Sequence, residues 1–225
     1  MIADPRAVAA RWPEPRLRAL AELAAVTTEA PWALSRGHHA RAREAGLSDD
    51  DVLHAIALAA FFGHLNRIAD AVELPLDYRV RREPPRLERA VPPLLPAPAP
   101  ITGEPALALS RRERTAAAIA AWNEHVARPS RALDGARRAM IAARVGRLVG
   151  AATVEAAPTR DGGADRALLE LADRITLAPW TIDAASYAPL RAAGLEDRDL
   201  FDACVVASTA GVRSRIEVAL IALGR

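Results

Sequence analysis

The chain has 225 residues, of which 51% are hydrophobic and 26% are charged, the composition of a globular protein with one good core or two small ones. This composition excludes disordered and collagen-like chains. The formal net charge is only +2 and arginines are interspersed with carboxylates, so no basic stripe follows the chain. We therefore expect no nucleic-acid partner.

The single cysteine and the amino terminus limit the compartment and the chemistry. Because Cys204 is the only cysteine, the chain forms no internal disulfide, CxxC redox pair or cysteine zinc cage. Residues 1–17 lack an apolar core of signal-peptide length, and no run approaches the roughly 18 apolar residues of a membrane span. We expect a cytoplasmic protein with no membrane partner.

Helix signals dominate, because Ala, Leu, Arg and Glu are plentiful and aromatic residues make up only 4% of the chain. The sequence predicts an all-α fold of seven or eight helices. In chain order they cover residues 4–26 with a break near Pro13 and Pro15, then 35–44, 52–72, 111–127, 130–150, 165–175, 183–192 and 197–223.

Two helix boundaries carry specific signals. Gly46 follows the helix over 35–44, at a position that favours a left-handed C-cap. Ser48 can cap the next helix, and the three aspartates after it place negative charge at the positive end of that helix. Residues 52–72 should therefore form one long, largely apolar core helix.

Prolines interrupt the middle of the chain, where nine of the 17 lie between Pro75 and Pro105. Proline lacks the backbone donor that a helix needs and favours extended structure. The sequence therefore predicts an N-terminal half over 1–76, a linker over 77–105 and a C-terminal domain over 106–225.

An internal repeat is the most informative pattern. A shift of 148 residues aligns 20–71 with 168–219 without a gap and gives 21 identities in 52 positions. The identical residues are caps, turns, small packing positions and one arginine, Arg67 in the first copy and Arg215 in the second. They indicate an internally duplicated fold.

The differences between the copies are more informative about chemistry. The first copy alone carries a polar and aromatic constellation; its members are His38, His39, His54, Phe61, Phe62, His64, Asn66 and Asp70, which the second copy replaces with Ser186, Tyr187, Asp202, Thr209, Ala210, Val212, Ser214 and Val218. We therefore place the candidate site in the N-terminal half.

Two segments, "AGLSDDDVLHAIALAAFFGHLNRIADAV" and "LLELADRITLAPW", carry a resemblance to a known family. They are similar to the "AGLSDEE" helix start and "FNxxNRxAD" segment of the carboxymuconolactone decarboxylase and AhpD-like alkylhydroperoxidase superfamily, especially of its peroxidase-related members. "ALDGARRAMIAARVGRLVGA" is similar to the helix that leads into the family's CxxC. The resemblance covers most of the chain and implies an AhpD-like helical bundle that forms homo-oligomers.

Redox members of this family use a CxxC thiol pair relayed by Glu and His. Here Ala151 and Val154 stand where the cysteines would fall, and Cys204 lies in an apolar helical run that is typical of a small core residue. The decarboxylase branch, by resemblance, works as an acid/base lyase without a disulfide, so the chain can still be an enzyme.

The functional hypothesis places His38 or His39 together with His64 in a pocket between the helices over 35–44 and 52–72. Histidine suits proton transfer because its pKa lies near 6.5. Adjacent helical residues point about 100° apart, so only one of His38 and His39 faces a given pocket. His125, with Trp122 nearby, is a further histidine that could join this site from the other half.

Four more residues are candidates for substrate contact beside Arg67: Asn66, Asp70, Trp32 and Phe62. The structural alternative for Arg67 is that it ties helix ends together, and the recurrence of an arginine at position 215 favours that reading. Packing also explains Trp32 well, since Trp180 stands at the same repeat position.

These residues predict a carboxymuconolactone decarboxylase-like enzyme that decarboxylates, isomerises or cyclises a small oxygenated metabolite by acid/base chemistry, with no cofactor or metal. One alternative is a peroxidase-related redox enzyme that uses a metal or external thiols. The metal form would need His38 or His39, His64 and a carboxylate, but no HxH, ExxH or HxxxH pair fixes two ligands on one element. The other alternative is a non-catalytic pseudoenzyme for assembly or ligand binding.

Overall fold

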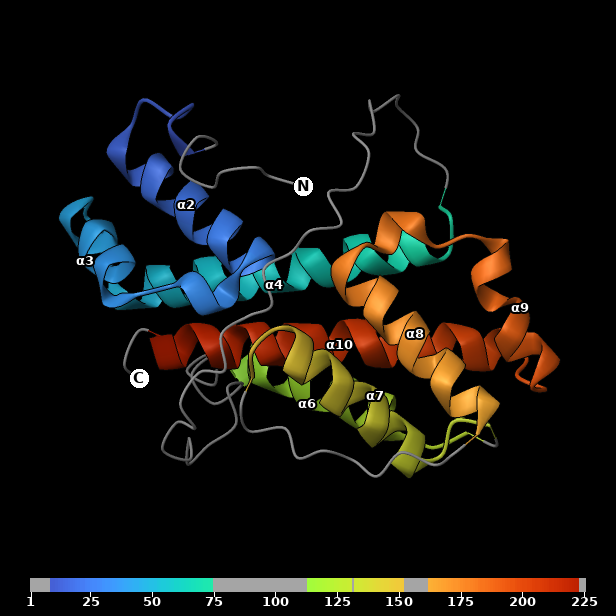
Figure 1. Cartoon of the computed structure of the whole chain (residues 1–225). Coiled ribbons are helices and arrows are strands. Elements are labelled where there is room, and N and C mark those ends of the chain that lie inside the picture. Colours follow the sequence, from blue (N-terminus) through green and yellow to red (C-terminus); the bar gives the residue numbers. More distant parts are fainter. Residues whose placement is uncertain (1–8, 75–112, 131, 152–161, 223–225) are drawn as a thin grey trace.

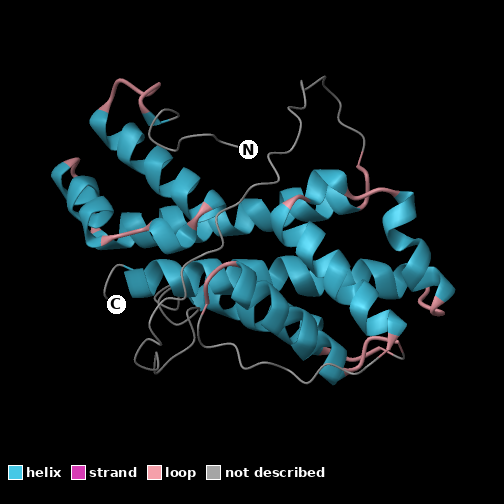
Figure 2. Cartoon of the chain, in the orientation of Figure 1, coloured by secondary structure: helices cyan, strands magenta, loops and turns pink. Residues whose placement is uncertain are grey.

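A computed structural model describes residues 9–74, 113–130, 132–151 and 162–222. Regular structure in these residues is entirely helical (Figure 2), which confirms the all-α prediction. The described elements are α2 (Pro15–Glu29), η1 (Pro31–Ala33), α3 (Arg36–Glu44), α4 (Asp49–Ala71), α6 (Glu113–Ala127), α7 (Gly135–Leu148), α8 (Gly163–Leu177), η2 (Pro179–Thr181), α9 (Ala184–Ala192) and α10 (Asp197–Ala222).

The helix boundaries follow local chemistry. The helix predicted over 4–26 is interrupted between Ala9, which is helical, and Pro15, which confirms the break predicted near Pro13 and Pro15. α2 begins at Pro15 because proline is favoured in the first turn, where its missing N–H costs nothing. α4 begins earlier than predicted, at Asp49, since Ser48 is its N-cap. The predicted linker over 77–105 lies outside the described residues.

The capping signals around Gly46 and Ser48 are both confirmed. Gly46 has a φ of 82°, in the left-handed region that glycine tolerates. The Ser48 hydroxyl accepts a hydrogen bond from the Asp51 amide at 3.1 Å, and the Asp51 carboxylate accepts one from the Ser48 amide at 2.9 Å. These Ser48 contacts hold the pKa of Asp51 below its ordinary value.

The two long helices α4 and α10 lie side by side and make the most extensive contact between described elements (Figure 1). α2 packs against α4, whereas α7 and α8 pack against α10. One hydrophobic cluster contains residues of α7, α8, α9 and α10, and it includes Ala71 at the end of α4. A second joins α2, α3 and α4 and includes residues of the last turns of α10. Each half therefore borrows apolar residues from the long helix of the other.

The same order of elements occurs twice along the chain. The bounds of α2, η1 and α3 recur 148 residues later as those of α8, η2 and α9, and the starts of α4 and α10 differ by the same interval. The short turns also cross over, since η1 packs on α10 and η2 packs on α4.

α4 departs from one expectation of the sequence. Among the described helices, α4 alone has the length and the apolar composition needed to cross a membrane. The sequence had predicted no apolar run of membrane-spanning length. Part of its most apolar window, 39%, is buried inside the protein, against α10 and α2. A core helix meets the same criterion, so this is weak evidence for a membrane span.

Candidate functional site

His38 belongs to the start of α3. Its Nδ1 lies 2.9 Å from the Ser35 hydroxyl and accepts a hydrogen bond from the Ser35 amide at 3.2 Å, so the ring completes the helix cap. Its Nε2 lies 3.7 Å from a carboxylate oxygen of Glu22. Glu22 borders a cavity of about 320 Å³, whose other lining residues are Ala9, Arg18 and Arg41.

His39 is held at the first turn of α4. Its Nε2 lies 2.8 Å from Oδ1 of Asp49, and Arg43 donates to the same oxygen at 2.7 Å. Oδ1 of Asp49 therefore bridges α4 to two side chains of α3.

The structure does not form the predicted pocket that His38 or His39 would share with His64. His64 lies 15 residues after Asp49 on α4, about 22 Å along the axis at 1.5 Å per residue. α3 meets α4 at its first turn, through the Asp49 bridge, so the histidines of α3 stay near the opposite end of the helix.

His64 instead meets residues of α6 and α10. It is 4% exposed, and its ring lies 6.0 Å from the Phe61 ring and 5.7 Å, edge-on, from that of Trp122. The Trp122 ring in turn lies 5.8 Å from that of His125. The structure thus brings together His64, Trp122 and His125, as the sequence suggested for the latter pair, while His38 and His39 lie elsewhere.

Burial controls the protonation of His64. It lowers the pKa of the ring, and the nearby Arg67 charge lowers it further, while a hydrogen bond to the Ser208 carbonyl opposes both. Because Nδ1 has no hydrogen-bond partner among the described residues, Nε2 is the nitrogen that donates to Ser208. His64 is therefore a neutral imidazole whose Nδ1 carries a buried lone pair able to accept a proton or a hydrogen bond.

Arg67 is buried in the same helix and folds back on its own turn. Its Nη1 donates to the Gly63 carbonyl at 2.8 Å, and Arg215 repeats this contact with Gly211 at 3.2 Å in α10. A Cβ at Gly63 would lie 2.7 Å from that Nη1, so glycine makes room for the guanidinium. This contact stabilises one turn of α4, and it does not tie helix ends together as the structural alternative for Arg67 expected.

We predict that Gly63→Ala destabilises the protein by about 1–2 kcal/mol, although alanine normally stabilises a helix interior by about 1 kcal/mol relative to glycine. The added methyl displaces the Arg67 guanidinium from its carbonyl. In an Arg67→Ala background the methyl meets no guanidinium, so Gly63→Ala should there increase the free energy of unfolding, measured with urea. Equal effects in both backgrounds would contradict this account.

The remaining candidates for substrate contact line neither the cavity beside Glu22 nor the larger groove between α6, α7 and α10; they are Asn66, Phe62, Asp70 and Trp32. Asn66 and Phe62 are exposed, Phe62 by 60%, and Asp70 is half-buried near the end of α4. Trp32 packs against a small cluster of Val149, Ala151 and Val218. The packing interpretation of Trp32 agrees with this contact.

An open groove of about 610 Å³ lies between α6, α7 and α10. Trp122 connects this groove to His64, because its indole Nε1 donates to the hydroxyl of Thr209, a lining residue, at 3.2 Å and its ring lies 5.7 Å from that of His64. The lining residues are Asn123, Val126, Ala127, Arg138, Ala139, Ala142, Val206, Thr209, Ala210, Arg213, Ser214 and Glu217.

Glu217 is the titratable group of this groove with a perturbed pKa. Burial raises the pKa of the half-buried carboxyl, and the charge of Arg213, one helical turn earlier, lowers it by less. Sequence reasoning missed both residues because it treated the second copy as degenerate. The available signal was the replacement of Leu65, Asn66 and Ala69 of the first copy by Arg213, Ser214 and Glu217.

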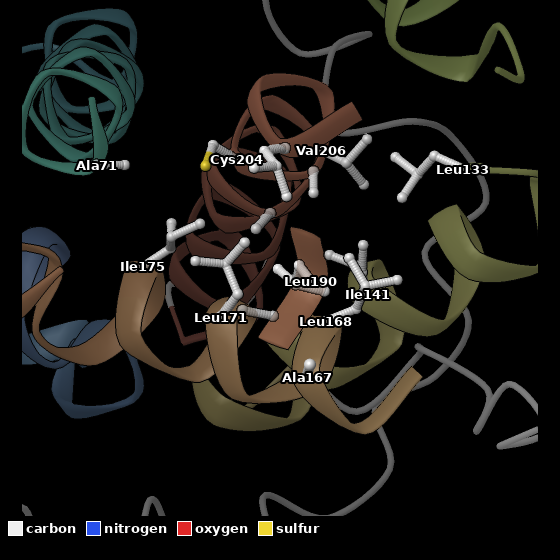
Figure 3. Close-up of a cluster of buried hydrophobic side chains, with 14 of the residues drawn as sticks. Ala71, Leu133, Ile141, Ala167, Leu168, Leu171, Ile175, Leu190, Cys204 and Val206 are labelled. Carbon is white, nitrogen blue, oxygen red and sulfur yellow. The ribbon is translucent and has the colours of Figure 1, made fainter. Parts of the chain in front are cut away.

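Cys204 is a core residue, as predicted. It is 1% exposed within the apolar cluster of α7 to α10 (Figure 3), and burial raises the pKa of its thiol to about 11. Its sulfur lies 3.5 Å from the Tyr187 hydroxyl, which donates to the Ala71 carbonyl at 2.6 Å. The thiol is therefore protonated and inaccessible near neutral pH.

The positions of the family's CxxC are partly visible: Ala151 is buried, and Val154 lies outside the described residues. Across the described ranges no group of three or more His, Cys, Asp or Glu side chains is placed to hold a metal ion. No family model, curated protein or solved structure matches the chain. The resemblance to the carboxymuconolactone decarboxylase superfamily therefore stays a prediction.

Proposed function

We propose that the chain is an internally duplicated, AhpD-like helical bundle of the carboxymuconolactone decarboxylase superfamily. Three observations support this. The element bounds recur after 148 residues, the aligned copies share 21 of 52 residues, and the same glycine-to-arginine contact occurs in α4 and α10. Independent origins would not give two helices the same buried arginine at the same register.

The proposed activity is cofactor-free acid/base chemistry on a small oxygenated metabolite bound in the groove. The observation that carries it is Glu217, a half-buried carboxyl with a raised pKa in the same groove as an arginine. Perturbed carboxyls in concave sites mark candidate acid/base groups. The groove volume of about 610 Å³ suits a small molecule.

Four residues of the groove have chemical roles in this proposal. Arg213 contacts a substrate carboxylate or lactone oxygen, and the hydroxyls of Thr209 and Ser214 orient it. In a decarboxylation, the bond to the departing carboxylate breaks, its electron pair passes to the substrate carbonyl, and the Glu217 carboxyl delivers a proton to the carbon that lost CO₂. The carboxylate left on Glu217 then regains a proton from water.

His64 would serve as a proton acceptor beside this acid, and Trp122 connects the two, since its ring contacts that of His64 and its indole donates to Thr209 of the groove. The proposal moves the principal proton-transfer role from His39 to Glu217, because His39 is bound to Asp49 at the far end of α4. His38 is likewise occupied by the cap of α3.

A variant pair tests the proposal. Small carboxylic acids and lactones are screened with wild-type protein by product NMR, and turnover is then compared in Glu217→Gln and Glu170→Gln. Glu170 is an exposed glutamate of α8 that lies 3.8 Å from Arg166, outside the groove, and serves as the matched control. We expect kcat to fall at least about 100-fold in Glu217→Gln with a small change in KM, and no change in Glu170→Gln.

The pH profile separates catalysis from binding. If the protonated carboxyl is the acid, kcat of wild type falls as the pH rises through the raised pKa of Glu217, and Glu217→Gln loses this limb. A Glu217→Gln variant with kcat near wild type would refute the assignment. The pseudoenzyme would be favoured by two results together: no compound of the panel is turned over, and variants of His64 and Glu217 fold and support growth of the host as well as wild type.

A further inference from the structure

An unusual apolar surface runs along the outside of α4. Leu58, Phe61, Phe62 and Leu65 are 57%, 49%, 60% and 44% exposed. Their spacing of three, four and seven residues places them on one helix face, and we call them the α4 stripe. The stripe extends towards α6, since His64 contacts both Phe61 and Trp122, and Trp122 is itself 40% exposed.

The repeat shows what this face of the long helix is built to contact. With the shift of 148 residues, the stripe corresponds to Val206, Thr209, Ala210 and Arg213 of α10. Those four residues face α6 and α7 across the groove. No described helix covers the stripe on α4, so the surface that is covered within the chain in one half is open in the other.

We propose that the α4 stripe is a self-association surface, on which a second copy of this chain packs its own α4 stripe about a two-fold axis. Such a contact is isologous and closes as a dimer, so it leaves no open stripe for further copies. The proposal concerns assembly and is independent of the proposed chemistry in the groove.

The size and charge of the surface fit this partner. The two half-exposed phenylalanines alone offer roughly 100 Å² each, and with both leucines and Trp122 the patch reaches about 500 Å². A patch of this size would form the apolar centre of an interface of ~800 Å² per partner, the size typical of a stable dimer. No Asp, Glu or Arg occurs between Leu53 and Asn66, so two stripes meet without burying a charge.

A lipid surface fits less well. The opposite face of α4 is buried against α10 and α2, so the helix cannot span a bilayer without unfolding the core. Asp50 and Asp70 lie near the two ends of α4 and Glu73 follows it, and anionic headgroups repel acidic side chains. Peripheral membrane helices instead carry basic residues beside their apolar face.

Sedimentation velocity of the full-length chain tests the proposal with Phe62→Glu and Phe201→Glu. Both replace a phenylalanine that is exposed, by 60% and 48%, but Phe201 lies near the start of α10, outside the stripe. We expect wild type and Phe201→Glu to sediment at twice the chain mass of 24.0 kDa. Phe62→Glu should dissociate at least about 100-fold more readily, because its charge would be buried at the interface.

Circular dichroism establishes that both variants keep the helical content of wild type. A wild type that stays monomeric up to about 100 µM overturns the proposal. This holds whether the α4 stripe is open to solvent or covered by another segment of the same chain. A Phe62→Glu dimer as stable as wild type overturns it as well. So does a monomeric wild type that sediments with vesicles of phosphatidylcholine and phosphatidylglycerol and loses this binding in Phe62→Glu.

Discussion

Replacing Arg138 with methionine is expected to destabilise the protein by about 3 kcal/mol. Arg138 is 8% exposed and connects three segments. It donates to the Val126 carbonyl at 2.7 Å, to the Leu133 carbonyl at 3.1 Å and to the Asp202 carboxylate at 3.1 Å. Methionine would fill part of the volume but leave the half-buried carboxylate and both carbonyls without this donor.

Arg144→Met is the matched control on the same helix. Arg144 makes a shorter, two-pronged contact with Asp173, at 2.6 Å to each carboxylate oxygen, and the carboxylate raises the pKa of the guanidinium. The side chains are 38% and 30% exposed, however, so water replaces much of what is lost. We expect a cost of at most about 1 kcal/mol in urea unfolding. A larger cost for Arg144→Met than for Arg138→Met would show that distance outweighs burial here.

Acidification is expected to destabilise the protein through His64. Burial lowers the pKa of the folded-state ring below 6.5, whereas the unfolded chain titrates near 6.5. Between these two values the unfolded state binds more protons, so the stability contribution is fully present above 6.5 and is lost as the pH falls. The free energy of unfolding should decrease by up to about 1.4 kcal/mol per pH unit in that window.

Urea unfolding at about pH 8 and about pH 5.5 measures this effect in wild type, His64→Gln and His125→Gln. His64→Gln should flatten the dependence between the two pH values, because the buried titrating group is gone. His125 is exposed, and its variant should retain the wild-type dependence. An NMR titration of the His64 ring with a midpoint above 6.5 would contradict the account.

The helix ends around residues 46–48 and the burial of Cys204 were accessible from the sequence. Ser48 and Gly46 fixed the ends of α4 and α3, because capping depends on residues within one turn of each boundary. The apolar run around Cys204 predicted a buried thiol for a similar reason, since a helix with apolar residues on all sides is buried.

The grouping of polar side chains depended on distances that the sequence does not contain. His39 and His64 lie on neighbouring elements, and both differ from the second copy, yet about four turns of α4 separate Asp49, which holds His39, from His64. Comparing the two sequence repeats identified the residues that differ between them. The comparison did not show that α6 would place Trp122 against His64.

The sequence by itself determined the helical class, the caps, the repeat and the core position of Cys204, because each depends on neighbours along the chain or on a fixed period. Only the tertiary structure decided which residues share a cavity. Among the described helices, α6 and α7 pack along α10, whereas α6 meets α4 through the ring contact of Trp122 with His64. This uneven packing places Arg213 and Glu217 in a groove and leaves Phe62 exposed. Such packing is set by contacts between residues far apart in sequence, which no local pattern encodes.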